Sequence, residues 1–225
     1  MLQKEAVASE MITMIKELQD NSLFKDHVLA GGTALTLQLG HRTSTDIDLF
    51  TQRTQNAVEL VDYFKKKYKN INVDIAENNF TRIYANGIKV EMVQYEEKII
   101  EKIVSEESIR LFGMNEIAAM KLSAITKRTE PRDFIDIAYL LREVSLEKMF
   151  ELYKEKYGTI SPLYMKRTLL IKSRIIKDNE WLAGGIKMLK YDIKPKEVPM
   201  FIEKAIERYN RNINIGKPDN EIENT

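Results

Sequence analysis

The chain has 225 residues, of which 44% are hydrophobic, and 35 Lys and Arg against 34 Asp and Glu give a formal net charge of +1. This length allows one large domain or two small ones, and the balanced charge excludes a strongly basic protein that coats nucleic acid. The lack of cysteine excludes disulfides and thiolate sites, and two histidines make a His-rich zinc site a poor explanation. No apolar run is long enough for a signal peptide or a membrane helix, so we expect a cytosolic protein without a membrane partner.

The first half of the chain alternates predicted helices with short strands. Apolar residues at three- and four-residue spacing predict a helix over the first 20 residues. The following predicted elements are a strand HVLAGG, a helix TALTLQLG, a strand DIDLF and a helix NAVELVDYFKKKY. A meander of short strands over residues 71–95 contains an Ala-Asn-Gly turn, which is a strong hairpin signal.

From about Ile99 the pattern changes to helices, several of which open with a proline. The predicted helices are NEIAAMKLSAITKR, PRDFIDIAYLLREV, SPLYMKRTLLIKSRII and VPMFIEKAIERYNRNI. The tail GKPDNEIENT has almost no apolar side chain and predicts disorder. The sequence therefore predicts an α+β fold, with a small mixed sheet over residues 1–105, an all-helical domain over 106–215 and a flexible tail over 216–225.

Three carboxylates stand in predicted strands. Asp46 and Asp48 are two residues apart, so their side chains lie on one face of a strand while Ile47 turns to the core. Adjacent negative charges are costly unless something compensates them, and a divalent cation does so. Glu91 stands mid-strand in an apolar stretch, and Glu is depleted in strands. The three predict a two-metal phosphoryl-transfer site, although each would also suit the solvent face of a strand.

A strand, a glycine pair and a helix precede the two aspartates. The Gly31-Gly32 turn allows backbone N–H groups and a helix N-terminus to face an anion. Thr33 adds a hydroxyl at that terminus, unless it only caps the helix. Arg42 and Ser44 lie just before the pair, and we expect Arg42 either to meet phosphate oxygens or to be a solvated loop arginine.

Charged residues also fall on the buried faces of two predicted helices. On a helical wheel, Lys121 and Arg128 lie within the apolar arc of their helix. Lys121 is predicted to be functional, whereas Arg128 at the helix end could extend to solvent. Asp133 and Asp136 are neighbours on the next helix; Asp133 suits the first turn, and Asp136 is either catalytic or paired with Lys121, Arg128 or Arg132 to hold the helices together.

Two of these stretches resemble a known family. LAGGTALTLQLGHRTSTDIDLFT (29–51) looks like the signature of the AbiEii nucleotidyltransferase toxins of type IV toxin–antitoxin pairs, and KLSAITKRTEPRDFIDIAYLL (121–141) is similar to their second block. NEWLAGGIKML (179–189) is also similar to this family. The resemblance implies a DNA polymerase β-like nucleotidyltransferase domain followed by a helical domain. It also implies an NTP substrate, magnesium (two ions, with Mn²⁺ as an alternative) and, in several members, modification of the tRNA 3′ end.

The resemblance also assigns roles to residues. Gly31 and Gly32 match the phosphate-gripping turn, where the wider superfamily often has Gly-Ser, and Thr33 would supply the missing hydroxyl. Asp46 and Asp48 match the metal-binding pair, and Glu91 falls where the third carboxylate is often Asp. The remaining matches, in the helical block, are Lys121 and the pair Asp133 and Asp136.

We therefore expect a Mg²⁺-dependent nucleotidyltransferase toxin. Asp46, Asp48 and Glu91 would hold the metals, Lys121 would neutralise the triphosphate, and Asp136 would orient Lys121 or position the acceptor. The nucleotide-binding set is Gly31, Gly32, Thr33, Arg42, Ser44, Lys121 and Arg128. We expect tRNA as acceptor and a separately encoded antitoxin as partner. The alternatives are transfer to a protein or small-molecule hydroxyl, and a non-catalytic nucleotide-binding regulator, which Glu91 facing solvent would favour.

Overall fold

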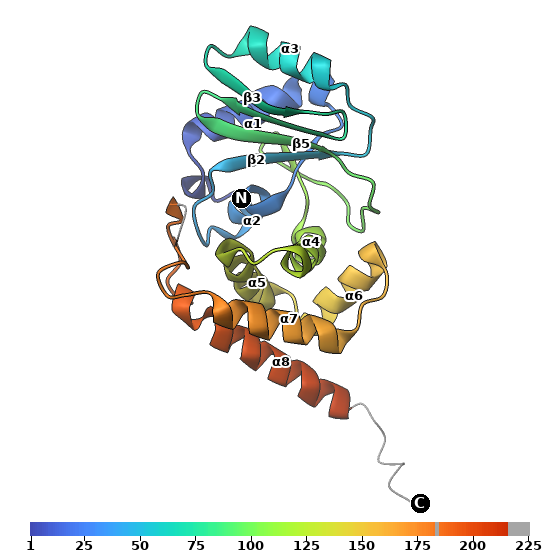
Figure 1. Ribbon diagram of the computed structural model, residues 1–225, viewed down its shortest axis with the longest axis vertical. Coiled ribbons are helices and arrows are strands. Elements are labelled where there is room, and N and C mark those ends of the chain that lie inside the picture. Colours follow the sequence, from blue (N-terminus) through green and yellow to red (C-terminus); the bar gives the residue numbers. More distant parts are fainter. Residues whose placement is uncertain (183–184, 216–225) are drawn as a thin grey trace, which may run out of the picture.

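The N-terminal half of the protein is a single mixed sheet with three α-helices packed against it, and the C-terminal half is helical (Figure 1). The computed structural model describes residues 1–182 and 185–215. The seven strands run in the order β3-β4-β5-β2-β1-β7-β6, with β2·β5 and β1·β7 parallel and the other pairs antiparallel. Their bounds are β1 Val28–Leu29, β2 Asp46–Thr51, β3 Ile71–Ala76, β4 Phe80–Ala85, β5 Ile88–Gln94, β6 Val104–Glu106 and β7 Ile109–Leu111.

The helices cover both faces of this sheet. Their bounds are α1 Ser9–Asp20, α2 Gly31–Leu39, α3 Ala57–Lys67, α4 Met114–Lys127, α5 Pro131–Glu143, α6 Leu146–Tyr157, α7 Pro162–Ile175 and α8 Val198–Ile215. Short 3₁₀ turns are η1 Lys4–Ala6, η2 Ser22–Phe24 and η4 Pro195–Glu197. Helix α3 lies on the side of the sheet away from the C-terminal helices, and α2 packs between β2 and helices α4 and α5 (Figure 1).

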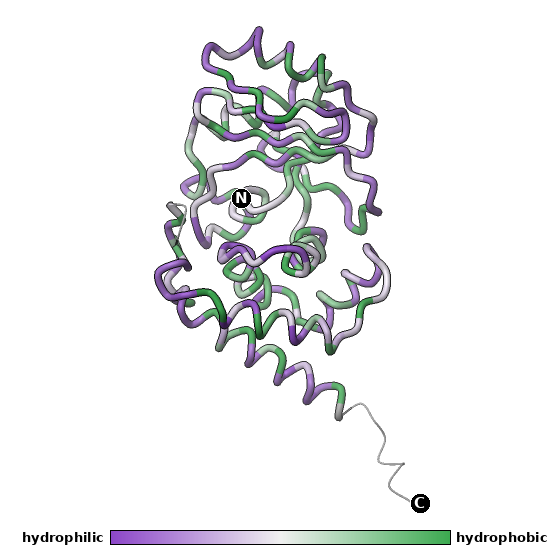
Figure 2. The backbone as a smooth tube through the Cα atoms, viewed as in Figure 1, coloured by the Kyte–Doolittle hydropathy of each residue, from purple (hydrophilic) through white to green (hydrophobic). Residues whose placement is uncertain are grey.

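One continuous core joins the sheet to the helices. Apolar and polar residues alternate along the strands and outer helices, as elements with one buried face require (Figure 2). The buried cluster extends from α1 through the sheet to α8, and includes Leu18, Leu49, Phe112, Ile117 and Ile202. Packing on both sides of the sheet therefore fixes the strand ends that carry the polar residues described below.

Most predicted elements are present, with four differences. The strand predicted over HVLAGG is only Val28–Leu29, because the two glycines already belong to α2. The N-terminal helix begins at Ser9 rather than at the chain start, because η1 and an isolated bridge at Val7 precede it. Helix α6 was not predicted, although Ser145 caps it and its apolar residues recur at helical spacing. Strands β6 and β7 were also missed, because three-residue strands carry too short an alternation to recognise.

The Asn-Gly turn forms as predicted, with Asn86 and Gly87 both at positive φ between β4 and β5. The predicted domain boundary at residues 105/106 lies inside β6, and the sheet continues through β7 to Leu111. The predicted tail, 216–225, lies outside the described residues. Among the described residues, none of the helices is both long enough and apolar enough to cross a membrane.

Candidate active site

Strands β2 and β5 place the three predicted carboxylates on one wall of a cavity. The strands are parallel, with Asp48 opposite Glu91 and Asp46 opposite Lys89. Side chains alternate across a strand, so Ile47 points to the core, where it is fully buried, while both aspartates face the cavity. Asp46, Asp48 and Glu91 all line this space of about 500 Å³, which α4 closes from the opposite side. The orientation of Glu91 is the one that the catalytic hypothesis requires.

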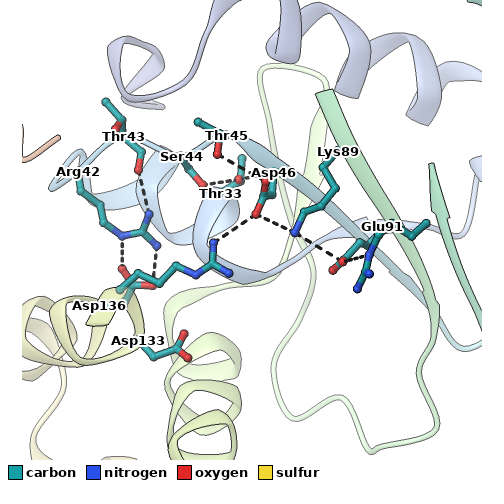
Figure 3. A network of polar contacts seen from close by, with 12 residues as sticks. Thr33, Arg42, Thr43, Ser44, Thr45, Asp46, Lys89, Glu91, Asp133 and Asp136 are labelled. Atoms are coloured by element: carbon teal, nitrogen blue, oxygen red, sulfur yellow. Dashed lines mark hydrogen bonds and ion pairs between the residues drawn. The ribbon is translucent and has the colours of Figure 1, made fainter. Parts of the chain in front are cut away.

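Cationic side chains form ion pairs with two of these carboxylates, Asp46 and Glu91 (Figure 3). The Lys89 ammonium lies 2.9 Å from Asp46 Oδ2 and 3.5 Å from Glu91 Oε1. Arg82 Nε donates to Glu91 at 2.7 Å, and Arg132 Nη1 to Asp46 at 3.3 Å. These three cations were missed in the sequence as site residues, although Lys89 is two residues before Glu91 and therefore shares its face.

The carboxylate wall fits a divalent metal in its chemistry. Desolvation at the cavity floor, together with the charges of Glu91 and Asp46, raises the pKa of Asp48 to about 7. Lys89 already places a positive charge between Asp46 and Glu91. Oxygen donors are those that Mg²⁺ prefers. Across residues 1–182 and 185–215, however, no group of three His, Asp or Glu side chains is already arranged to hold a metal ion.

The glycine pair lies directly beside this wall, at the start of α2. Gly31 has φ +66°, and a Cβ at this position would overlap the Asp48 carboxylate. A Cβ at Gly32 would lie 2.5 Å from Arg42 Nη2. Both glycines line the cavity, and the first N–H groups of a helix have no partner within it. The turn therefore offers backbone donors next to the carboxylates and leaves room for Asp48 and Arg42.

Thr33 and Ser44 form hydrogen bonds at the start of β2, the strand that carries the two aspartates. The Thr33 hydroxyl is fully buried and donates to the Asp46 backbone carbonyl, and it lies 2.8 Å from Ser44 Oγ. It does not cap α2, because the N-cap is Ala30 and no side chain caps that end. Ser44 lines the cavity, whereas Thr33 is not among its lining residues. The structure thus places Thr33 as a support for Asp46.

Arg42 is neither solvated nor free. Its side chain is buried, and its guanidinium donates to both Asp136 oxygens, at 2.7 Å from Nε and 2.9 Å from Nη2. Nη1 donates to the Thr43 carbonyl, so its polar hydrogens are largely used within the protein. The expectation of a solvated loop arginine was therefore wrong, because α5 supplies a buried carboxylate that the local sequence does not reveal.

Asp136 is the centre of a buried network. Besides Arg42, it accepts from His41 Nε2 at 2.8 Å and faces the Lys121 ammonium at 2.6 Å. Burial alone would raise the pKa of Asp136, but the charges of Arg42 and Lys121 outweigh it and hold the pKa well below its usual value. Burial lowers the pKa of His41. Asp136 therefore stays ionised and joins α5 to the segment before β2.

Lys121 and Arg128 converge on the second helical aspartate. The Lys121 ammonium lies 2.7 Å from Asp133 Oδ1, and Arg128 Nε donates to Asp133 Oδ2 at 2.7 Å. Lys121 is buried, as its position on the apolar arc predicted, and both cations line the cavity. Asp133 is fully buried, and it forms ion pairs with Lys121 and Arg128 in addition to lying in the first turn of α5. Asp133 and Asp136 are not among the cavity-lining residues.

Known proteins resemble this chain in sequence and in fold. A family model described as the nucleotidyl transferase AbiEii toxin of type IV toxin–antitoxin systems matches residues 14–209. An uncharacterized Aquifex aeolicus (strain VF5) protein, aq_aa25, is 26% identical over 205 residues, which cover 83% of this chain and 89% of that one.

Two solved structures share the fold. A candidate nucleotidyltransferase from H. pylori superposes with a TM-score of 0.56 at 16% identity, over 92% of this chain and 95% of that chain. MenT4, a nucleotidyltransferase toxin from Mycobacterium tuberculosis H37Rv, superposes with a TM-score of 0.51 at 12% identity, over 92% and 89%. The family match covers most of the chain: the protein belongs to the AbiEii nucleotidyltransferase toxin family of type IV toxin–antitoxin systems and is a nucleotidyltransferase.

Proposed function

We propose that the protein transfers a nucleoside monophosphate from an NTP to the 3′-terminal hydroxyl of tRNA, with Mg²⁺ as cofactor. The observation that carries the proposal is the register of β2 and β5, which sets Glu91 opposite Asp48 on one cavity wall. Asp46, Asp48 and Glu91 would hold the metal, with Mn²⁺ as an alternative ion. When bound, the metal polarises the phosphate and favours ionisation of the attacking hydroxyl.

The residues of the chain have separable roles in this scheme. The Gly31 and Gly32 amides would bind the triphosphate at the start of α2. Lys121 and Arg128 would supply positive charge from α4. Arg128 and Arg132 are 50% and 38% exposed at the side chain, so both can also meet a nucleic-acid backbone. Asp136 would act by positioning Lys121 and Arg42.

The choice of tRNA rests on the family resemblance. Membership in a type IV toxin–antitoxin family favours a target in translation and a separately encoded antitoxin, and tRNA would place the reaction in the cytosol. A protein or small-molecule hydroxyl would use the same carboxylates, so the acceptor has to be identified directly.

The test is to incubate the protein with Mg²⁺, each of four α-labelled NTPs and total bacterial RNA. We expect label in a tRNA-sized band for the wild type and none for Asp46→Ala/Asp48→Ala. The matched control, Asp20→Ala/Asp62→Ala, removes two exposed helix carboxylates and should label RNA normally. RNA oxidised with periodate lacks the 3′ cis-diol and should accept no label.

The other outcomes separate the parts of the proposal. Label on protein or on a small molecule would keep the transfer chemistry and refute tRNA as acceptor. Label on periodate-oxidised RNA would refute the 3′ end as the position. Bound NTP without any transferred label would contradict transfer itself and favour a nucleotide-binding regulator.

A further inference from the structure

The cavity changes from charged to apolar along its own strands. On β2, Phe50 follows Asp46 and Asp48 on the same face, and on β5 Val93 follows Glu91. Phe50 and Val93 are opposite each other in the sheet register. At the rise of a β-strand, this apolar section begins about 7 Å beyond the carboxylates. A nucleoside triphosphate has the same division, because its charge lies at one end and its aromatic base at the other.

Two tyrosines complete the apolar end. Tyr95 follows β5, Tyr157 ends α6, and both line the cavity with their hydroxyls 2.9 Å apart. The Tyr95 ring packs against Phe50 with their centroids 5.0 Å apart. Ile117 and Met120 of α4 line the same space. Burial raises the pKa of Tyr157 to about 12, and it raises that of Tyr95 as well, so both hydroxyls stay neutral.

A buried ion pair that the transfer chemistry does not use lies behind these rings. The side chains of Glu116 and Lys156 are both fully buried and paired with each other. The Lys156 ammonium lies 4.7 Å from the Tyr95 ring centroid and 5.6 Å from that of Tyr157. It also donates to the Lys98 carbonyl, while Glu116 accepts from the Ile100 amide at 2.8 Å. Such a pair adds little net stability but fixes geometry.

We propose that Tyr95 and Tyr157 form the wall that binds the nucleobase of the incoming NTP, with Glu116 and Lys156 as positioning residues. The inference rests on the proposed function, because it assigns the base-binding part of that nucleotide site. Aromatic rings stack on any base, whereas the neutral hydroxyl pair supplies a donor and an acceptor that can distinguish base edges. The wall therefore contributes to NTP affinity and to the choice of base.

The test compares ligands with and without a base. Calorimetry with Mg²⁺ would measure binding of the α,β-methylene analogues of the four NTPs and of inorganic tripolyphosphate. We expect Tyr95→Leu and Tyr157→Leu each to weaken the preferred analogue about 10-fold or more, with tripolyphosphate unchanged within about twofold. Tyr191→Leu, at a tyrosine that is 77% exposed, is the matched control and should change neither.

Conservative variants separate stacking from folding. Tyr95→Phe and Tyr157→Phe keep the rings, so the preferred analogue should bind nearly as tightly as to the wild type. The ratio of affinities between the preferred and the other base analogues should decrease, because the hydroxyls are lost. Lys156→Met/Glu116→Leu removes the buried pair without leaving a lone charge. We expect the double variant to reduce the ratio of affinities between the base analogues while the affinity for tripolyphosphate stays unchanged. A purely structural role of the pair would not produce this selective effect.

Three results would overturn the assignment. Equal weakening of analogue and tripolyphosphate would show that the rings act on the phosphate end. Unchanged analogue affinity with a raised KM for RNA would assign the wall to the acceptor. Wild-type protein that binds tripolyphosphate but no base analogue would exclude a base site. Wild-type protein that binds neither ligand would instead contradict the proposed function.

Discussion

Replacing Asp136 by Asn tests the buried network most directly. The substitution keeps the size of the side chain but removes the charge that faces Arg42 and Lys121, both of which are buried. Removing one partner of a buried ion pair costs about 3–5 kcal/mol, because the remaining charge is left unpaired. For a chain of this length, the melting temperature should fall by about 6–20 °C.

The same variant should change the pH dependence of stability. The pKa of Asp136 is well below its usual value in the folded protein, so its contribution is complete above the unfolded-state pKa of about 4. It is lost as the pH falls from there through the folded pKa. The difference in unfolding free energy between wild type and Asp136→Asn should therefore be constant from about pH 5 to 8 and narrow below about pH 4.

Urea unfolding followed by circular dichroism, repeated across this pH range, measures the free-energy cost and its pH dependence, and thermal unfolding measures the change in melting temperature. The control is Glu151→Gln, which removes one partner of an exposed pair with Lys148 and should cost less than about 1 kcal/mol at every pH. If Asp136→Asn lowers the free energy of unfolding by as little as the control does, the network does not stabilise the fold and the reasoning is refuted. A difference that widens as the pH falls below 4 would refute the sign of the pKa shift.

Two substitutions test the support of the carboxylate wall. Gly31→Ala would place a Cβ on the Asp48 carboxylate, so label transfer should fall about 100-fold. Gly87→Ala is the control, because φ is also positive there but nothing lies within 4 Å of the new Cβ; it should strain the backbone and leave transfer unchanged. Equal loss of transfer in both variants would contradict overlap with Asp48 as the cause. Thr33→Val should lower the free energy of unfolding, measured with urea, by about 1–3 kcal/mol, because the Asp46 carbonyl then loses its hydrogen bond from Thr33. It should lower kcat without changing NTP affinity, whereas a direct contact between Thr33 and nucleotide would weaken NTP binding.

Local patterns predicted the parts of the site that depend on neighbours in sequence. Two-residue spacing predicted that Asp46 and Asp48 share a face, and the helical wheel predicted a buried Lys121. The ion pair between Arg42 and Asp136 could not be read in this way, because the two residues are 94 positions apart and meet only when α5 packs beside α2. Glu91 was predicted as the third carboxylate, but its register opposite Asp48 could not be predicted, because the topology of the sheet sets it.

The two groups of acidic residues beside the cavity differ in what they can do. Asp136 has both oxygens occupied by Arg42, His41 and Lys121, and it is fully buried, so it has no lone pair to offer a substrate. Asp46, in contrast, is paired with the long side chains of Lys89 and Arg132, which can move aside at modest cost, and it accepts one long hydrogen bond, at 3.5 Å, from Thr45 Oγ1. A metal ion can therefore replace the cations at the carboxylate wall but not those around Asp136. In the proposed transfer, this difference favours a catalytic role for the carboxylates of β2 and β5 and a positioning role for α5, which holds Lys121 and Arg42.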